Sequence, residues 1–360
     1  MYRLGVIPGD GIGPEVVAQA LRILEAVSSH HGFQYRLHPY PFGADHYLET
    51  GEFLPDSALE EIRNLDALLL GAIGDPRVER GGLERGILSR LRQGLDLYIN
   101  LRPIKLYSEH LCPLKGKTPQ DLDLVLVREN TEDVYTGLGG FFKKGTDEEV
   151  ATAEALFTRR GVERVIRYAF DLARERPRRH LTLVDKANVV PAHDLWRRCF
   201  AEVGREYPDV TTASAYADAA AMWMIKNPEW FDVVVTTNIF GDILMALGAQ
   251  LQGGVGLAAS ANLHPGQVSL FEPIHGSAPK HAGAGTANPL GAIMAVQMML
   301  DFLDEGAAAA HIERAVRSVL DSGTLRDVST RSGRSTGEIG DLVLAELDRT
   351  RDTVQEMARP

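Results

Sequence analysis

Three short runs of leucine and β-branched residues constrain the fold of this chain more than any other feature of its sequence. The runs are Leu124–Val127, Leu181–Val184 and Val233–Val235. Runs of this kind predict strands that are buried on both faces of a parallel sheet. Helical periodicity lies between them, at 161–174 and 193–204. Strands that alternate with helices indicate an α/β fold built on a mostly parallel, doubly wound sheet.

A polar segment follows each of these three runs. The segments are RENTEDVY (128–135), DKANV (185–189) and NIFGD (238–242). In open α/β sheets, ligands bind outside the carboxyl ends of the strands. Such a collection of acids and bases at strand ends is typical of an enzyme. We therefore expect one cleft to receive a common set of side chains: Arg128, Tyr135, Lys186, Asn188 and Asp242.

Composition places the chain among globular proteins and excludes several other classes. At 360 residues it can bury a sizeable core and fold as two domains or lobes. A net charge of −11 argues against binding to nucleic acid or to an anionic membrane. No segment approaches the ~20 apolar residues of a membrane helix, and the N-terminus lacks the apolar stretch of a signal peptide. Two distant cysteines, Cys112 and Cys199, predict free thiols, and together these features predict a cytoplasmic enzyme.

The remaining elements follow from local patterns. The glycines of GDGIG (9–13) are spaced G-x-G-x-G, unlike the G-x-G-x-x-G of dinucleotide-binding turns, so a tight strand-to-helix turn is the favoured interpretation. The glycine-rich segment Gly253–Gly266 predicts a crossing between lobes. Further expected elements are strands at Leu4–Ile7, Ala67–Leu70 and Gln267–Phe271, and helices from Pro14, at 287–302 and around Ala307–Ala310.

Three arginines, Arg92, Arg102 and Arg128, are candidates for holding a dicarboxylate. A guanidinium fork matches the two oxygens of a carboxylate with parallel hydrogen bonds. The alternative is that these are ordinary solvated arginines. Arg102 lies within NLRP and Arg128 at the end of a buried strand, which favours a functional role for those two; Arg92 alone leaves both interpretations open.

Candidate metal ligands and acid–base groups have alternatives of their own. Asp218 and Asp242 carry the oxygen ligands that Mg²⁺ and Mn²⁺ prefer, although Asp218 is also a candidate helix N-cap because AAAM follows it. Tyr135 and Lys186 are a candidate acid and base, against a core aromatic and a surface lysine. The segment Phe271–Pro279 contains small residues that let backbone N–H groups approach a phosphate or an adenine.

Taken together, these motifs resemble the β-decarboxylating dehydrogenases, a family that includes 3-isopropylmalate, isocitrate, homoisocitrate and tartrate dehydrogenases. The match runs from IPGDGIGPE near the N-terminus to GEIGD near the C-terminus, in the family's order. The resemblance implies two α/β lobes on a shared, mostly parallel twisted sheet that differs from the Rossmann fold. It implies a cofactor-binding lobe of residues 1–98 with 254–360, and a substrate, metal and dimerisation lobe of residues 99–253.

The resemblance also implies a role for each motif. Tyr135 matches the tyrosine that protonates the enol carbon, and Lys186 matches the lysine that takes the hydroxyl proton through water. Asp218 and Asp242 match metal ligands; Lys186 and Asp218 match residues of the neighbouring subunit, which implies a homodimer with shared active sites. The implied substrate-binding residues are Leu88, Ser89, Arg92, Arg102, Arg128 and Asn188. The implied cofactor-binding residues are Glu272, His275, Gly276, Ser277, Ala278, Lys280, His281 and Asn288.

Two segments depart from the family's usual pattern. Members usually carry a second aspartate four residues after the one that Asp242 matches, and here Ala246 stands there. This departure predicts weaker metal binding or a changed activity, unless Asp218, substrate and water suffice. Lys280 and His281 stand where NAD-dependent members usually carry an acid, which favours NADP over NAD.

The specificity helix, ERGILSRLR, contains conflicting signals about the substrate. Leu88 resembles the apolar contact of isopropylmalate enzymes, whereas Arg85 is long enough to reach a third carboxylate and the segment RENTEDVY is closer to isocitrate-type enzymes. We expect an NAD(P)-dependent oxidative decarboxylation of a substituted (R)-malate that requires Mg²⁺ or Mn²⁺, with 3-isopropylmalate converted to 2-oxoisocaproate. The alternatives are isocitrate, homoisocitrate, tartrate or malate as the substrate, or, in view of Ala246, a catalytically impaired regulatory subunit.

Overall fold

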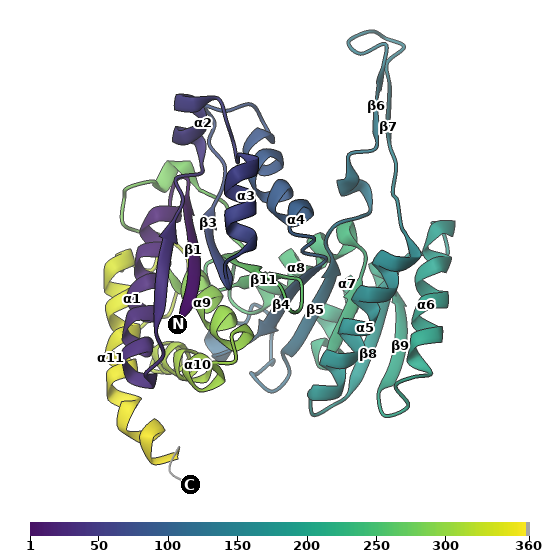
Figure 1. The fold of residues 1–360 in the computed structure, drawn as a ribbon. Helices are drawn as coiled ribbons and strands as arrows, with labels where there is room; N and C mark the ends of the chain where they lie inside the picture. The colour runs from purple at the N-terminus through teal and green to yellow at the C-terminus, as the bar shows by residue number, and fades with distance from the viewer. Residues whose placement is uncertain (358–360) are drawn as a thin grey trace. The chain divides into compact units, whose positions relative to one another are not determined.

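The structure, a computed structural model, describes the backbone of residues 1–357 and the side chains of residues 1–351 (Figure 1). The chain forms two compact units. Unit 1 contains Met1–Leu97, Lys105–Gln120 and the described residues from Ala249 onward. Unit 2 contains Tyr98–Ile104 and Asp121–Gly248.

Unit 1 is built on five strands with the spatial order β2-β1-β3-β12-β11. β1 pairs in parallel with both β2 and β3, and β12 pairs in parallel with β3. Only the β11–β12 pair is antiparallel among the described pairs of this unit. All six residues of β3 are buried, as expected for a strand covered on both faces. The strands are β1 (Tyr2–Gly9), β2 (Tyr35–Pro39), β3 (Ala67–Ala72), β11 (Ala259–Leu263) and β12 (Ser269–Pro273).

The helices of unit 1 include one that is apolar on nearly every side. This helix, α9, is buried because it packs against α1, α10 and the strands β11 and β12 (Figure 1). The longer helices are α1 (Gly13–His31), α9 (Leu290–Phe302), α10 (Gly306–Asp321) and α11 (Thr336–Met357). The shorter ones are α2 (Ala44–Thr50), α3 (Asp56–Arg63), α4 (Arg90–Gly94) and a π-helix, η1 (Glu84–Ser89).

The glycine turn between β1 and α1 confirms the expected tight strand-to-helix connection. Gly11 has a φ of 58°, in the region that favours glycine. A Cβ atom at Gly11 would lie 2.0 Å from the carbonyl oxygen of Ser277, so no side chain fits. The backbone N–H of Ile12 donates to the same carbonyl at 2.8 Å. The turn therefore supports the Phe271–Pro279 segment.

Unit 2 contains the three apolar runs as neighbouring strands. Its strand order is β4-β5-β10-β8-β9, and β5, β10, β8 and β9 are mutually parallel. Val235 lies opposite Val127 on one side and Leu183 on the other. The expected mostly parallel α/β class is therefore confirmed. The strands are β4 (Ile99–Lys105), β5 (Asp123–Glu129), β8 (His180–Asp185), β9 (Thr211–Tyr216) and β10 (Val233–Thr236).

The helices of unit 2 follow the predicted periodicity. Thr158 caps α5 by accepting the backbone N–H of Gly161, and α5 turns its apolar face toward β5, β8 and β10. The helices are α5 (Arg159–Glu175), α6 (Asp194–Gly204), α7 (Ala217–Lys226) and α8 (Asn238–Leu251). Short 3₁₀ helices lie in unit 2 at Val134–Thr136, Pro191–His193 and Pro228–Trp230, and in unit 1 at Glu109–Leu111 and Pro279–His281.

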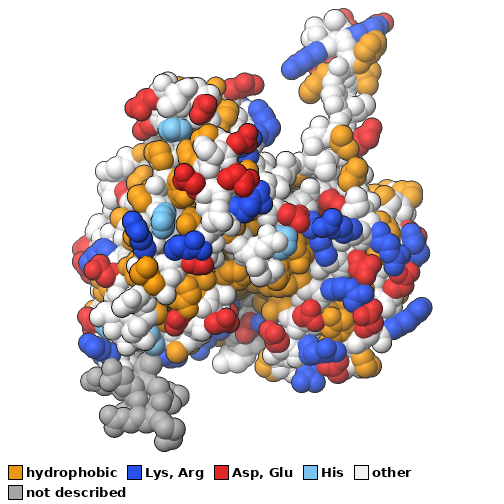
Figure 2. All heavy atoms as spheres, viewed as in Figure 1, with side chains coloured by type: hydrophobic (Ala, Val, Ile, Leu, Met, Phe, Trp, Pro, Cys, Tyr) orange, Lys and Arg blue, Asp and Glu red, His pale blue; other side chains and the backbone are white. Residues whose placement is uncertain are grey.

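A two-stranded hairpin extends from the rest of unit 2 (Figure 1). It pairs β6 (Gly139–Phe142) with β7 (Val150–Ala153) in antiparallel register, and every residue of both strands is exposed. Hydrophobic and charged side chains lie together at its tip (Figure 2). An isolated two-stranded hairpin is marginally stable in water, so this one presents apolar surface without a core of its own.

Three features add to the sequence expectations. The glycine-rich crossing Gly253–Gly266 contains a strand, β11. Unit 2 ends at Gly248, within α8, whereas the expected second lobe ended at residue 253. Asp218 is not the N-cap of α7; Tyr216 holds that position, and Asp218 lies in the first turn.

Residues 105–120 fall in unit 1, whereas the expected second lobe ran from 99 to 253. Cys112 and Cys199 are free thiols, as expected. Within the described residues, no helix is long and apolar enough to cross a membrane.

Candidate active site

The carboxyl ends of three adjacent strands in unit 2 hold most of the predicted acids and bases. Arg128 lies near the end of β5, opposite Thr236 of β10. Lys186 directly follows the last residue of β8, and Asn238 begins α8 two residues after β10. Because β10 pairs with both β5 and β8, the three motifs start from one edge of the sheet.

Arg128 is a deeply buried charged side chain of this group, at 1% exposed. Its Nε donates to Oδ1 of Asn238 at 2.8 Å, and its Nη1 donates to Oδ1 of Asp242 at 2.5 Å. Its guanidinium lies 5.1 Å from the centre of the Tyr135 ring. A Cβ atom at Gly241 would lie 2.5 Å from the Arg128 side chain, so this glycine leaves room for it. The structure thus brings Arg128, Tyr135 and Asp242 together.

Tyr135 lies on a turn that is linked to α8 by the side chain of Asp133, a residue with a strained backbone. Asp133 is buried with φ 68° and ψ −150°, a conformation nearly restricted to glycine. Its carboxylate accepts the backbone N–H of Val134 and that of Ile239, each at 2.9 Å. The bond to Ile239 fixes the turn to the first residues of α8. The Tyr135 side chain itself is partly exposed.

Lys186 and Asp218 form a second cluster in unit 2. The Nζ atom of Lys186 lies 2.7 Å from Oδ1 of Asp218 and 5.7 Å from the centre of the Tyr216 ring. The hydrogen bond from Lys186 holds the pKa of Asp218 below its ordinary value. Asn188, two residues beyond the lysine, is exposed. Arg102, the remaining predicted residue of this unit, lies on β4 and is partly buried.

Arg92, in unit 1, already holds a carboxylate partner. Its Nε donates to Asn262 at 2.9 Å and its Nη2 donates to Glu272 at 3.1 Å. Asn262 donates in turn to Glu272 at 2.8 Å, and both side chains are buried. Glu272 was expected to contact the cofactor and Arg92 the substrate. In this structure a substrate carboxylate would compete with Glu272 for the guanidinium of Arg92.

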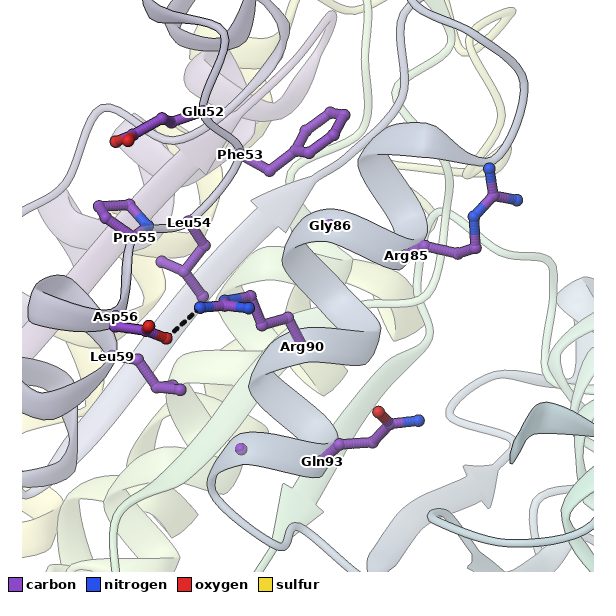
Figure 3. Close-up of a pocket in the computed structure, with 11 residues that line it drawn as sticks. Glu52, Phe53, Leu54, Pro55, Asp56, Leu59, Arg85, Gly86, Arg90 and Gln93 are labelled. Carbon is purple, nitrogen blue, oxygen red and sulfur yellow. Dashed lines mark hydrogen bonds and ion pairs between the residues drawn. The ribbon is translucent and has the colours of Figure 1, made fainter. Parts of the chain in front are cut away.

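The predicted specificity residues lie at the end of the π-helix in unit 1. Leu88 packs partly against the hydrophobic core of this unit, which leaves only part of its side chain for a substrate. Ser89 is partly buried at the end of the same helix. A pocket of about 770 Å³ lies beside this helix. Figure 3 shows Arg90 reaching across the pocket toward Asp56, while Arg85 extends away from that pair.

The predicted cofactor loop lines a separate cavity of about 480 Å³ in unit 1. Gly276 has open space where a Cβ atom would lie. Asn288 is buried; its amide donates to the carbonyl of Val328 and its Oδ1 accepts the backbone N–H of Leu290. Burial lowers the pKa of His275, which therefore stays neutral at neutral pH. The cavity is lined by Ile12, Val255, Gly256, His275, Gly276, Ala278, Ala287, Asn288, Val328, Ser329 and Thr330.

The three other predicted cofactor residues differ in exposure. Ser277 is buried, and its carbonyl is occupied by Ile12. Lys280 is exposed and His281 is partly buried, both in the 3₁₀ helix Pro279–His281. A small-residue cavity next to a basic helical turn has the size and chemistry to hold a nucleotide.

The two candidate metal ligands do not form a complete site within one chain. Among the residues that the structure describes, no group of three or more His, Cys, Asp or Glu side chains is placed to hold a metal. Asp242 is paired with Arg128 and Asp218 with Lys186. Ala246, one turn after Asp242, is exposed and adds no ligand. The carboxylate oxygens of these two aspartates are of the kind that Mg²⁺ and Mn²⁺ prefer.

Comparison with known proteins identifies the family of this chain. Residues 3–343 match the model of the isocitrate/isopropylmalate dehydrogenase family. The chain belongs to this family. A 3-isopropylmalate dehydrogenase from Thermobifida fusca is 51% identical over 343 residues, which are 94% of this chain and 96% of the relative. The enzyme of that name from Nocardia farcinica is 50% identical over 349 residues, 96% of this chain and all of the relative.

Solved structures agree with this isocitrate/isopropylmalate dehydrogenase assignment. An isocitrate dehydrogenase from Methylococcus capsulatus matches with a TM-score of 0.87 and 40% identity, covering 96% of this chain and 99% of its own. A β-decarboxylating dehydrogenase from Thermococcus kodakarensis matches over the full length of both chains with a TM-score of 0.81 and 36% identity. The predicted family and its fold are therefore confirmed.

Sequence reasoning missed several residues that support the candidate site. Asn238 and Gly241 shape the surroundings of Arg128, and Asp133 fixes the turn of Tyr135. His193, seven residues after Lys186, contacts the backbone of that lysine. NIFGD was recognised for its aspartate alone, although its asparagine and glycine were equally visible.

Proposed function

We propose that the chain catalyses the NAD(P)-dependent oxidative decarboxylation of 3-isopropylmalate to 2-oxoisocaproate. The observation that carries the proposal is the identity of about 50%, over nearly the whole chain, with relatives of that name. Leu88 adds an apolar contact for an alkyl substituent. The test is product analysis: one equivalent each of reduced cofactor, CO₂ and 2-oxoisocaproate should form from 3-isopropylmalate. If the folded protein, supplied with Mn²⁺ and both cofactors, does not turn over 3-isopropylmalate, the proposal is contradicted.

The arginines and the acid–base pair have distinct roles in the proposed reaction. Arg128 and Arg102, with Arg92 after release from Glu272, bind the two carboxylates of the malate portion. The Nζ atom of Lys186 receives the C2 hydroxyl proton through water, and the Tyr135 hydroxyl returns a proton to the carbon that CO₂ leaves. When bound, Mg²⁺ or Mn²⁺ would polarise the C2 oxygen and a nicotinamide would accept the hydride.

A second candidate function is isocitrate dehydrogenase. It is favoured by the structural match to the Methylococcus capsulatus enzyme and by Arg85, which is exposed on the specificity helix and has no acidic partner within the pocket of Figure 3. Arg85 would pair with the third carboxylate of isocitrate. The relative rates on the two substrates decide between these candidates.

The active unit is proposed to be a homodimer. Exposed large apolar side chains lie on the hairpin, on α7 and on α8: Phe141, Phe142, Met222, Trp223, Ile225 and Ile243. Contiguous exposed apolar patches mark interfaces between proteins, and we propose that these side chains form such a patch. Within one chain the metal ligands and the acid–base groups lie in two separate clusters. In the proposed dimer, Lys186 and Asp218 of one chain would lie beside Asp242 of the other and complete the site.

Shared sites predict complementation between two inactive variants. Lys186→Ala and Asp242→Asn chains should each be inactive as pure proteins. Co-expressed, they should form mixed dimers in which one site receives an intact Lys186 and an intact Asp242. Initial rates of the co-expressed protein should therefore exceed those of either variant alone. If the co-expressed protein forms mixed dimers yet stays inactive, each chain builds its own site.

Metal affinity is predicted to be weak without substrate. The Asp242 carboxylate is engaged by Arg128, whose positive charge opposes a cation, and Ala246 supplies no oxygen. Ala246→Asp should tighten Mn²⁺ binding by about tenfold, which corresponds to ~1.4 kcal/mol. Calorimetric titration of the substrate-free protein measures this. Gln250→Asp, which adds the same charge one turn further along α8, is the control and should leave affinity unchanged. Tight Mn²⁺ binding by the wild type would reveal a further ligand.

The cofactor preference is proposed to lean toward NADP. Lys280 is exposed, follows the cofactor loop directly and has only donors, so it suits a 2′-phosphate better than ribose hydroxyls. Lys280→Asp should shift the ratio of kcat/KM toward NAD by roughly tenfold or more. Lys115→Asp, an equal charge change at another exposed lysine of unit 1, should not shift it. A wild type that strongly prefers NAD, unchanged by Lys280→Asp, would show that Lys280 does not contact the ribose.

A further inference from the structure

A buried histidine contacts the backbone of the candidate catalytic lysine. His193 is 3% exposed and ends the 3₁₀ helix Pro191–His193, seven residues after Lys186. The backbone N–H of Lys186 donates to Nδ1 of His193 at 2.9 Å. Since a backbone N–H can only donate, Nδ1 must be unprotonated and the proton of the neutral ring must lie on Nε2.

The histidine ring is itself held in place by two aromatic side chains. Phe157 meets it edge-on with ring centres 5.1 Å apart, and Phe240 does so at 5.7 Å. Phe240 lies in the first turn of α8, between Asn238, which binds Arg128, and Asp242. The ring of His193 therefore connects the DKANV segment to the helix that carries the other cluster.

Both backbone groups of Lys186 are fixed by this loop. Its N–H donates to His193, and its carbonyl accepts the N–H groups of Val190 at 2.8 Å and Val189 at 3.0 Å. The N–H of His193 donates to the carbonyl of Val190 at 3.0 Å, which closes the loop. The orientation of the Lys186 backbone, from which the side chain reaches Asp218, depends on these bonds.

The charge of His193 is consistent with an acceptor role. Burial lowers the pKa of His193, while the carboxylates of Asp185 and Asp133 act in the opposite direction. The Asp185 carboxylate is engaged by Arg197 and by the backbone N–H of Ala187, so it leaves the ring neutral. At neutral pH the imidazole keeps its lone pair on Nδ1 for Lys186.

We propose that His193 is a positioning residue, which orients Lys186 for proton transfer by accepting its backbone N–H while Phe157 and Phe240 hold the ring. The inference rests on the proposed role of Lys186 as the base. A small rotation of the backbone at Lys186 moves Nζ, at the end of a long side chain, by a much larger distance. Misplacement of a reacting group by about 1 Å can cost ~10²-fold in rate. A purely structural loop closure would instead affect stability alone.

Three substitutions of His193 distinguish the effect of the position of the hydrogen-bond acceptor from the effect of ring packing. H193N places an amide oxygen near the position of Nδ1, H193Q places it near the position of Nε2, and H193F keeps a ring without an acceptor. H193F and H193Q should lower kcat roughly tenfold or more, with KM for the malate substrate little changed. H193N should retain most of kcat. The isotope effect on kcat with C2-deuterated substrate should rise in the two impaired variants, because chemistry becomes slower than product release.

The control is Trp196→Phe, at a fully buried aromatic residue that also packs against Phe157 but makes no hydrogen bond to Lys186. It should lower the melting temperature without changing kcat. Wild-type kcat in H193F, or equal impairment of H193N and H193Q, would overturn the inference. If H193F does not fold, the ratio of kcat in H193N to kcat in H193Q tests the inference by itself. Any malate that the wild type turns over serves for this comparison; turnover of none would instead contradict the proposed function.

Discussion

Replacing Lys186 by alanine, or Tyr135 by phenylalanine, should lower kcat by at least ~10²-fold, the usual contribution of a positioned acid or base. KM for the substrate should change little, because the arginines that bind the carboxylates remain. The measurement is steady-state kinetics at saturating cofactor and Mn²⁺. Stability should be nearly unaffected by Lys186→Ala, since its partner Asp218 is an exposed carboxylate that water can solvate.

Matched controls exist for both substitutions. Lys115→Ala removes an exposed lysine from unit 1, and Tyr35→Phe removes a tyrosine hydroxyl from β2 of the same unit. Neither should change kcat. Near-normal kcat in both Lys186→Ala and Tyr135→Phe, with a C2-deuterium isotope effect showing that chemistry limits the rate, would mean that other groups move the protons.

Arg128→Lys should raise KM for the substrate by about tenfold to a hundredfold and should also destabilise the protein. A lysine ammonium cannot reproduce the two directed bonds to Asn238 and Asp242 and still present a fork to a substrate carboxylate. Hydrogen bonds to charged groups contribute ~1.5–3 kcal/mol each, and ~1.4 kcal/mol corresponds to tenfold. Kinetics and urea unfolding of the same protein measure the two effects.

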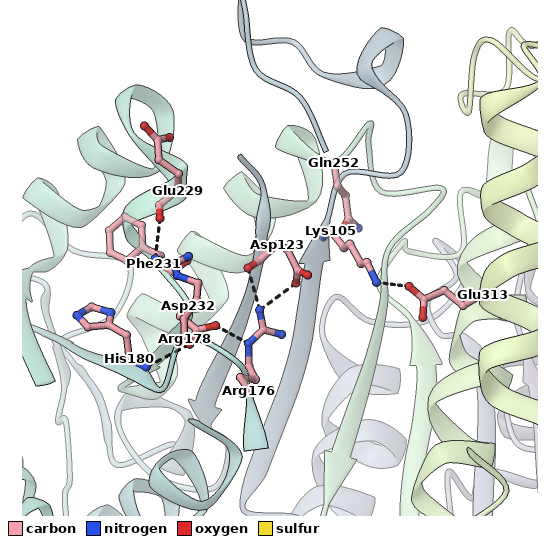
Figure 4. A network of polar contacts seen from close by, with 10 residues as sticks. All are labelled: Lys105, Asp123, Arg176, Arg178, His180, Glu229, Phe231, Asp232, Gln252 and Glu313. Atoms are coloured by element: carbon pink, nitrogen blue, oxygen red, sulfur yellow. Dashed lines mark hydrogen bonds and ion pairs between the residues drawn. The ribbon is translucent and has the colours of Figure 1, made fainter. Parts of the chain in front are cut away.

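Arg176 supplies the control at the opposite end of β5. Its guanidinium binds Asp123, the first residue of that strand, and the buried carboxylate of Asp232 (Figure 4). Arg176→Lys should therefore reduce the free energy of unfolding while leaving KM unchanged. If both arginine variants lose stability and neither changes KM, Arg128 has a structural role and does not bind substrate.

The strands and helices that could be predicted are those whose sequence pattern follows from burial or periodicity within the element itself. The apolar runs predicted β5, β8 and β10 because a strand that is buried on both faces excludes polar residues along its whole length. Helical periodicity likewise predicted α5 and α6 to within two residues of their observed ends. β11 was missed because its sequence, ASANL, is short and only partly apolar, and because glycines precede it. Its strand conformation depends on pairing with β12, which only the tertiary fold provides.

Partners of the candidate site residues were harder to predict than the residues themselves. Arg92 and Glu272 were both singled out, but for different ligands, and they are paired with each other across 180 positions of sequence. Lys186 was recognised by its motif, whereas the loop closure that brings His193 to it is a tertiary event. The strained backbone of Asp133 was equally invisible, since nothing in RENTEDVY marks that position as requiring a positive φ.

The preferred substrate is decided by comparing kcat/KM for 3-isopropylmalate and isocitrate under identical conditions with Mn²⁺ and both cofactors. The apolar contact at Leu88 should favour the alkyl substituent by ~1–3 kcal/mol. A third carboxylate without a partner costs more to bury. We predict at least ~10²-fold higher kcat/KM for 3-isopropylmalate, which corresponds to ~2.8 kcal/mol. A higher kcat/KM for isocitrate would overturn the assignment of 3-isopropylmalate as the substrate and would indicate that Arg85 binds the third carboxylate.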